Sequence, residues 1–319
     1  MSGWQMFQHR RAVNSRLRRA QPMSGAPFAF VPCTAAGICS DRNFVSAAQP
    51  SGTYGPPSRA RVHDHTPPEV LARRKARERR PVLKPISVLT VILCLTFAGS
   101  TFWVPDFGGF EPDQFPVPQE DPAIQPAGYA FAIWGLIYGW LLAGMTFGLW
   151  KRAEDSDWHA MRGPLCVSLA VGSIWLPVAD KSPVWAAILI WAMLIPALIA
   201  LFRAPRGDTA WALAPVALYA GWLSAASCVA LGLIAAGYGY LDEQTAALVF
   251  IFAALVIASA VQNQLRRAPA YGIAVIWALV AIVVQNASTN PTVAALAAGG
   301  AIALVLPVWR VWRGQGCAT

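Results

Sequence analysis

Charged residues are scarce in this chain, and the places where they are missing are informative. Asp, Glu, Lys and Arg make up 13% of its 319 residues, against about a quarter in an ordinary soluble domain. Between residues 88 and 307 long apolar runs repeat with short polar breaks, and no run has an ionisable side chain in its middle. Ion and proton pumps keep such groups at membrane depth. The pattern therefore argues against a charge relay.

Lysine, histidine and paired cysteine are also missing where chemistry would need them. The four lysines, Lys75, Lys84, Lys151 and Lys181, fall in the tail or in loops, which excludes a retinal Schiff base inside a helix. No histidine falls within an apolar run, and no nucleophile–base pair stands out, so we expect no catalytic residues. The six cysteines show no paired spacing, so we expect neither a metal site nor a disulfide framework, and we expect no cofactor.

Apolar sequence is what the chain has in abundance, at 56% of its residues. A helix needs about 20 apolar residues to cross a bilayer, and helices are the default because lipid cannot satisfy free backbone groups. Eight segments qualify: 86–104, 127–149, 164–179, 183–202, 211–236, 245–263, 271–287 and 292–309. The segment 164–179 is short and contains Pro177, so we expect that it is kinked or that it leans on neighbouring helices. We therefore predict an all-α, polytopic membrane bundle of about eight transmembrane helices.

The charges of the connections alternate along the chain. The connection 105–126 carries only acids, 237–244 carries Asp242 and Glu243, and the turns at 180–182 and 288–291 have no net charge. The connections between these hold the basic residues Lys151, Arg152, Arg162, Arg203, Arg206, Arg266 and Arg267, and Arg310 and Arg313 follow the last segment. Because basic residues mark the cytoplasmic side, we predict that both termini are cytoplasmic, in a bacterial inner membrane.

Residues 1–84 form a basic tail. They hold 15 of the 25 Lys and Arg but only four of the 16 Asp and Glu, and they lack apolar periodicity, which predicts disorder. Three interpretations stay open: a transit segment, a misassigned start, and a cytoplasmic tail whose segment 73–80 lies on anionic lipid. We interpret His63-Asp64-His65 as part of a solvated loop. No fold for nucleic acid is visible, so we expect no nucleic-acid partner.

Aromatic motifs recur in three of the apolar segments. They read Pro126-Ala127-x-Tyr129-x-Phe131-x-x-Trp134-x-x-x-Tyr138, then Gly172-Ser173-Ile174-Trp175-Leu176-Pro177, then Tyr219-x-x-Trp222-x-Ser224-x-Ala226-x-x-x-Ala230. In this order they resemble the motifs of the tryptophan-rich sensory proteins, the TspO/MBR family that includes the translocator protein. The resemblance covers roughly residues 86–236. The chain departs from the family where Tyr129 replaces Trp, where Gly172 and Ala230 replace Asn, and where the Phe131–Trp134 spacing is one residue short.

The resemblance implies a five-helix core at residues 85–236, followed by three additional transmembrane helices at 237–319. It also implies non-catalytic binding, sensing or movement of a flat apolar ligand, with a tetrapyrrole ranked above a sterol. Broad aromatic rings stack on such a macrocycle, and a small residue leaves room for it. Carried over by position, the ligand-binding residues are Tyr129, Phe131, Trp134, Tyr138, Trp175, Tyr219, Trp222 and Ala226.

Other interpretations stay open beside this one. Interfacial placement or helix packing also accounts for aromatic rings, and we expect it for tryptophans at segment ends such as Trp103, Trp185 and Trp309. The alternative function is a permease for a neutral small molecule that uses all eight helices. Membrane lipid and a homodimer are the further partner hypotheses.

Overall fold

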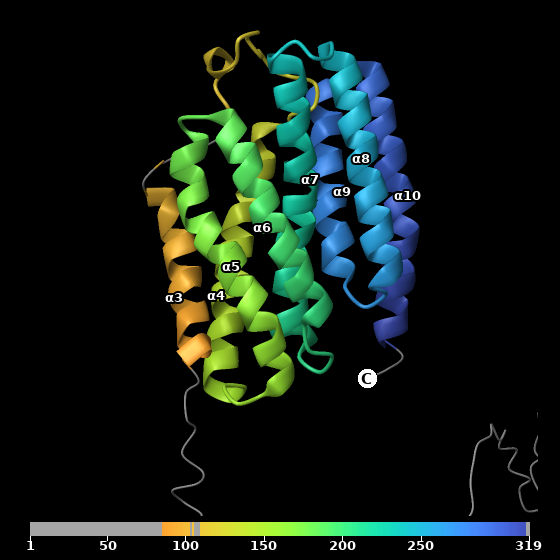
Figure 1. Ribbon diagram of the computed structural model, residues 1–319. Helices are drawn as coiled ribbons and strands as arrows, with labels where there is room; N and C mark the ends of the chain where they lie inside the picture. The colour runs from red at the N-terminus through yellow and green to blue at the C-terminus, as the bar shows by residue number, and fades with distance from the viewer. Residues whose placement is uncertain (1–84, 103, 105–108, 317–319) are drawn as a thin grey trace, which may run out of the picture. The chain divides into compact units, whose positions relative to one another are not determined.

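A computed structural model describes residues 85–102, 104 and 109–316 (Figure 1). The predicted tail, residues 1–84, lies outside the described residues. The long helices are α3 (Pro85–Gly99), α4 (Ile133–Lys151), α5 (Ser156–Ala179), α6 (Pro183–Arg203), α7 (Ala214–Gly237), α8 (Glu243–Gln264), α9 (Pro269–Asn286) and α10 (Pro291–Gly316). Short 3-10 turns lie at η1 (Ser100–Phe102), η2 (Pro112–Gln114) and η3 (Gly128–Ala132), and η4 (Thr209–Leu213) is a π-helical turn before α7.

The described ranges contain eight helical segments that are long and apolar enough to cross a membrane, and no strand. The prediction of an all-α membrane bundle is therefore confirmed. Consecutive helices run in opposite directions (Figure 1). The most extensive contacts join α5 to α6 and α9 to α10, and α7 also packs on α9 and α3 on α5. Helix α7 is the most deeply buried, since it packs against α4, α6, α8 and α9.

Helix α5 begins earlier than the sequence analysis predicted. Asp155 caps its N-terminus, because its carboxylate accepts hydrogen bonds from the backbone N–H groups of Asp157 (2.9 Å) and Trp158 (3.3 Å). The helix therefore starts at Ser156, whereas the predicted segment starts at 164. The prediction was wrong here because the first turns of α5 are polar, and Asp157 is exposed.

Arg162 corrects a second expectation, since it is not in a loop. It lies within α5 and is 1% exposed. Its guanidinium donates to the backbone carbonyls of Gly148 (2.8 Å) and Arg152 (3.2 Å) at the C-terminal end of α4. The Gly148 carbonyl also accepts the Arg152 backbone N–H (3.1 Å), so Arg162 adds a second hydrogen bond there. A cation at this end of a helix is also favoured by the helix dipole. Arg162 thus caps α4 from inside the bundle.

Small residues and paired hydroxyl groups allow the close approach of the helices around α7. Gly221 on α7 lies so near the backbone carbonyl of Tyr271 on α9 that a Cβ atom would clash. Small residues let membrane helices approach in this way. Two buried tyrosine hydroxyls have partners there, because the Tyr271 hydroxyl donates to Ser224 Oγ (2.8 Å) and the Tyr219 hydroxyl lies 2.8 Å from Ser168 Oγ.

The connections separate by charge onto the two ends of the bundle. The acidic end carries the long connection 109–127, the turns 180–182 and 238–242, and the start of α8 (Figure 1). The opposite end carries the connections 152–155, 204–208 and 265–268 and the end of α10. We call it the basic end because Lys and Arg outnumber Asp and Glu there, although 152–155 also holds Glu154 and Asp155. This alternation agrees with the charge pattern of the sequence. Assignment of the basic end to the cytoplasm stays a prediction.

The long connection is fastened across the acidic end by hydrogen bonds to four other segments. Gln114 Nε2 donates to the Asp180 carbonyl (2.8 Å), and the Val117 N–H donates to the Gly237 carbonyl (2.9 Å). The Ala123 N–H donates to a Glu243 carboxylate oxygen (2.7 Å), and Asn286 Nδ2 donates to the Ala123 carbonyl (2.8 Å). The connection therefore closes the bundle at this end and holds its aromatic side chains in place.

Candidate ligand-binding site

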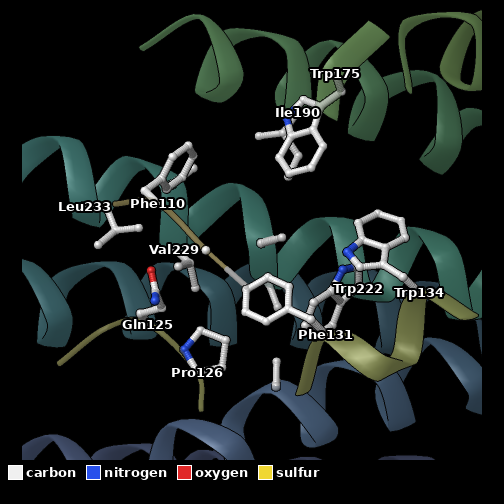
Figure 2. A pocket seen from close by; sticks show the side chains of 15 residues that line it. Phe110, Gln125, Pro126, Phe131, Trp134, Trp175, Ile190, Trp222, Val229 and Leu233 are labelled. Atoms are coloured by element: carbon white, nitrogen blue, oxygen red, sulfur yellow. The ribbon is translucent and has the colours of Figure 1, made fainter. Parts of the chain in front are cut away.

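A pocket lies inside the bundle under the long connection, and we name it the inner pocket (Figure 2). Its lining is apolar apart from one amide and the indole nitrogens, and it comes from the long connection, η3 and helices α4, α5, α6, α7 and α9. The lining residues are Gly109, Phe110, Gln125, Pro126, Phe131, Trp134, Trp175, Ile190, Trp222, Ala225, Ala226, Val229, Ala230, Leu233 and Ala278.

One face of α7 supplies the largest share of this lining. Its contributing residues are 222, 225, 226, 229, 230 and 233, which are separated by alternating steps of three and one. This spacing places all of them on a single stripe of a helix with 3.6 residues per turn. Three of the six are alanine, so the stripe is bulky at Trp222 and leaves space between Trp222 and the long connection.

Three aromatic side chains form a wall at one side of the inner pocket, and we name Phe131, Trp134 and Trp175 the aromatic wall. Trp134 and Trp222 meet edge to face, with ring centroids 6.1 Å apart, and Phe131 meets Trp222 likewise at 6.0 Å. The Trp175 indole N–H donates to the Ala186 carbonyl (3.0 Å). Because these contacts fix the ring orientations, the wall presents defined aromatic faces.

A second space lies on the other side of the aromatic wall, and we name it the side cleft. It is lined by Thr101, Val104, Phe131, Trp134, Gly135, Tyr138, Trp175 and Leu176, so it lies between the end of α3 and helices α4 and α5. Its volume is about 320 Å³, at the lower end of the range for ligand sites. The inner pocket holds about 50 Å³, which is room for one or two water molecules.

The indole nitrogen of Trp222 is a buried donor without an acceptor among the described residues. Trp222 is 2% exposed and lines the inner pocket, with Trp134 and Phe131 beside it (Figure 2). A buried donor without a partner is unfavourable by about 1–3 kcal/mol. An apolar ligand that carries one acceptor could remove this penalty, so Trp222 adds a polar preference to an otherwise apolar site.

The eight residues named from sequence are distributed over three environments. Phe131, Trp134, Trp175, Trp222 and Ala226 come together around the inner pocket. Tyr138 lines the side cleft, where its ring stacks on Trp134 with centroids 5.5 Å apart. These six residues are therefore brought to the two faces of one aromatic wall.

Tyr129 and Tyr219 line neither space. Tyr129 lies in the 3-10 turn η3, is 46% exposed and meets the ring of Trp277 edge to face at 5.6 Å. Tyr219 is fully buried, and its hydroxyl pairs with Ser168 on α5. One turn of α7 separates it from Trp222, but it faces Phe97 of α3, with ring centroids 5.7 Å apart. Both tyrosines therefore lie outside the linings of the two spaces, and their role as ligand-binding residues stays a prediction.

The sequence reasoning did not name several of the lining residues. Phe110 and Gln125 come from the long connection, and nothing local to their sequence marks them as facing the bundle interior. Ile190 belongs to α6, which has apolar residues on all sides. Ala225, Val229 and Leu233 are different, because the stripe that they share with Trp222 and Ala226 was a signal that could have found them.

Comparison with protein families matches residues 116–309 to the TSPO-like protein family. No curated protein and no solved structure gives a match. The family match begins in the long connection and continues through α8, α9 and most of α10, whereas the resemblance drawn from the motifs ended at residue 236. The division into a five-helix core and three additional helices stays a prediction. Since the match covers more than half of its length, this integral membrane protein belongs to the TSPO-like (TspO/MBR) family.

Proposed function

We propose that the protein binds a flat apolar ligand, a tetrapyrrole first among candidates, in order to sense or move it, and that it catalyses no reaction on it. The observation that supports this proposal is the aromatic wall, which has free space on both of its faces. A planar ring system gains most from stacking on such faces. The family resemblance supplies the tetrapyrrole as the ligand class.

The proposed ligand site is the side cleft together with the inner pocket. At about 50 Å³ the inner pocket is too small for a macrocycle, whereas the side cleft offers about 320 Å³ beside the same rings. We therefore place the ligand in the side cleft against Trp134 and Tyr138. The inner pocket lies behind the same rings, so a polar substituent of the ligand that entered it would meet the free N–H of Trp222.

The lining of the two spaces supports the proposal that the protein catalyses no reaction. Neither space is lined by Asp, Glu, His, Lys, Arg or Cys. General acid–base and nucleophilic catalysis use such groups within hydrogen-bond reach of the reacting atoms. The phenol of Tyr138 is the only ionisable side chain in the combined lining, and it stacks on Trp134. The site therefore favours binding over chemistry.

The test is titration of a porphyrin into the detergent-solubilised full-length chain, followed by the porphyrin absorbance band. Stacking of a planar ring on an aromatic side chain contributes about 1–3 kcal/mol. We expect Trp134→Ala and Trp222→Ala each to weaken porphyrin binding by about five- to a hundredfold, at about 1.4 kcal/mol per decade. Trp309→Ala is the matched control, since Trp309 is half exposed on α10 and lines neither space.

Two results would count against the proposal. Equal affinities in the three variants would show that the aromatic wall does not hold the ligand. No porphyrin binding by the parent chain would exclude a tetrapyrrole, and uptake of neutral solutes into sealed vesicles would then favour the permease.

A further inference from the structure

A third cavity lies at the basic end, between the end of α8 and the end of α10. It is lined by Gln262, Asn263, Arg266, Pro307, Arg310 and Val311 and has a volume of about 350 Å³. We name it the arginine cleft. None of its lining residues belongs to the inner pocket or the side cleft, so whatever binds here is independent of the proposed function.

The arginine cleft carries positive charge that no carboxylate of its own helices offsets. Arg266 donates one hydrogen bond, from Nε to the Asn263 carbonyl (3.3 Å), although a guanidinium has five N–H donors. Arg310 has no hydrogen-bond or ion-pair partner among the described residues. Residues 244–316, which include all of α9 and α10, contain no Asp or Glu. The cleft therefore has free cationic donors and selects for an anion.

A buried amide adds a polar group to the same cleft. Gln262 is 2% exposed, and both its Oε1 and its Nε2 lack a hydrogen-bond partner among the described residues. Its Oε1 lies close to Gly272 of α9, which has no side chain to offer a donor. Leaving a buried amide without partners is unfavourable. A ligand that accepts a hydrogen bond would satisfy Nε2 and accounts for a polar residue at this position.

The surroundings of the arginine cleft indicate which kind of molecule carries the anionic group. The outer face of α10 next to the cleft is apolar and exposed, with Ile302, Leu306 and Trp309 between 48% and 73% exposed. Trp309 lies near the end of the helix, the position at which tryptophans settle at a membrane interface, and Arg313 stacks on its ring at 3.7 Å. The cleft thus lies where apolar helix surface gives way to arginine, at the level of lipid headgroups.

We propose that the arginine cleft binds the phosphate group of an anionic phospholipid. Arg266 and Arg310 would hold the phosphate oxygens, because guanidinium groups match phosphate geometry with paired N–H donors. Gln262 Nε2 would donate a further hydrogen bond, and the acyl chains would lie along the apolar face of α10. Basic pockets between transmembrane helices bind phosphate-bearing headgroups in this way.

The test uses the full-length chain in a neutral detergent, titrated separately with phosphatidylglycerol, phosphatidylcholine and inorganic phosphate, with the melting temperature as readout. We expect phosphatidylglycerol to stabilise the protein more than phosphatidylcholine does. Arg266→Gln and Arg310→Gln should each weaken the phosphatidylglycerol effect about fivefold, the scale for one arginine at an anionic membrane surface. Arg203→Gln is the matched control, because Arg203 is exposed at the same end but lies on α6, outside the cleft.

Gln262→Leu separates a binding role from a structural one. Removal of an unsatisfied buried amide should leave the lipid-free melting temperature unchanged or raise it, while phosphatidylglycerol binds more weakly. If inorganic phosphate stabilises the protein as much as the lipid does and competes with it, the cleft is a phosphate-binding site whose ligand is free phosphate and not a lipid. The proposal is overturned if phosphatidylglycerol is no better than phosphatidylcholine, or if Arg203→Gln weakens binding as much as Arg310→Gln does.

Discussion

Asp208 is the residue that joins two connections at the basic end. Its carboxylate accepts hydrogen bonds from Arg152 Nε (2.8 Å) and Nη2 (3.2 Å) and from the Trp158 indole N–H (2.8 Å). The hydrogen bond from Arg152 is the largest cause that lowers the pKa of Asp208, and the Trp158 bond lowers it further against the opposing effect of burial. Asp208 thus links the start of α5 to the turn that leads into α7.

This geometry predicts a pH-dependent contribution to stability. The pKa of Asp208 is lower in the folded chain than the value near 3.9 of an unfolded chain. The stabilisation is therefore fully present above about pH 4 and is lost as the pH falls through the folded pKa. We expect Asp208→Asn to lower the melting temperature at pH 7, by an amount that stays constant to about pH 5 and shrinks below about pH 4.

Melting curves of the parent and the variant between pH 3 and pH 7 test this expectation. Asp157→Asn serves as the control, because Asp157 is exposed at the same end and its side chain makes no hydrogen bond that the structure records. A difference between parent and Asp208→Asn that does not change at low pH would contradict an ionised Asp208 as the source of the stabilisation.

At the scale of elements, a glycine allows the close approach of α7 and α9. Gly221 faces the backbone of Tyr271, so a methyl group there has no space unless the helices separate. Gly139 on α4 serves as the comparison position, because nothing lies within 4 Å of the place that its Cβ would take. Both are helical glycines in membrane-spanning segments.

Alanine substitution at these two glycines should therefore have opposite effects. Gly221→Ala overpacks the α7–α9 contact, and overpacking is unfavourable by about 1–3 kcal/mol. Gly139→Ala removes backbone freedom from the unfolded chain and favours the helix by about 0.5–1 kcal/mol. Melting temperatures in one detergent should fall for the first variant and rise slightly for the second. A Gly221→Ala protein as stable as the parent would show that the helices can separate at no cost.

The elements were more predictable from the sequence than the site was. Apolar length and loop charge predicted eight spanning helices, because a bilayer imposes both on any chain. The start of α5 was missed because Arg162 reads as a loop residue until its carbonyl partners on α4 are seen. The family motif predicted Trp222 and Ala226 as pocket residues. Phe110 and Ile190 line the pocket only because of tertiary packing, which the sequence does not show. Tyr219 shows the reverse, since its motif position is matched but its ring faces α3.

At the scale of the whole molecule, the bundle has two ends of opposite charge. The acidic end carries Glu111, Asp113, Asp180, Asp242 and Glu243. The basic end carries Arg203, Arg206, Arg266, Arg267 and Arg310, which outnumber its acids Glu154, Asp155 and Asp157, and Asp208 there is paired with Arg152. Because arginine near the ends of spans marks the cytoplasmic side, the charge distribution predicts one orientation for all eight helices together.

Cysteine labelling of intact cells or oriented vesicles checks this orientation. The labelling background replaces Cys33, Cys39 and Cys317 by serine and keeps Cys94, Cys166 and Cys228, which are buried. An impermeant thiol reagent should react with Glu111→Cys from the outer side and with Arg266→Cys from the cytoplasmic side. If residue 111 reacts from the cytoplasmic side alone, the predicted topology is wrong.

The opposite charges of the two ends also couple the bundle to the voltage of an energised membrane. Carrying one elementary charge through 100 mV takes about 2.3 kcal/mol. With the arginine-bearing end inward, a negative interior attracts that end and repels the acidic connections, so field and charge pattern act in the same direction. An inverted copy would hold several charges against the field at once. In the predicted orientation, the membrane potential would therefore favour the same placement of the two ends as the positive charges of the loops.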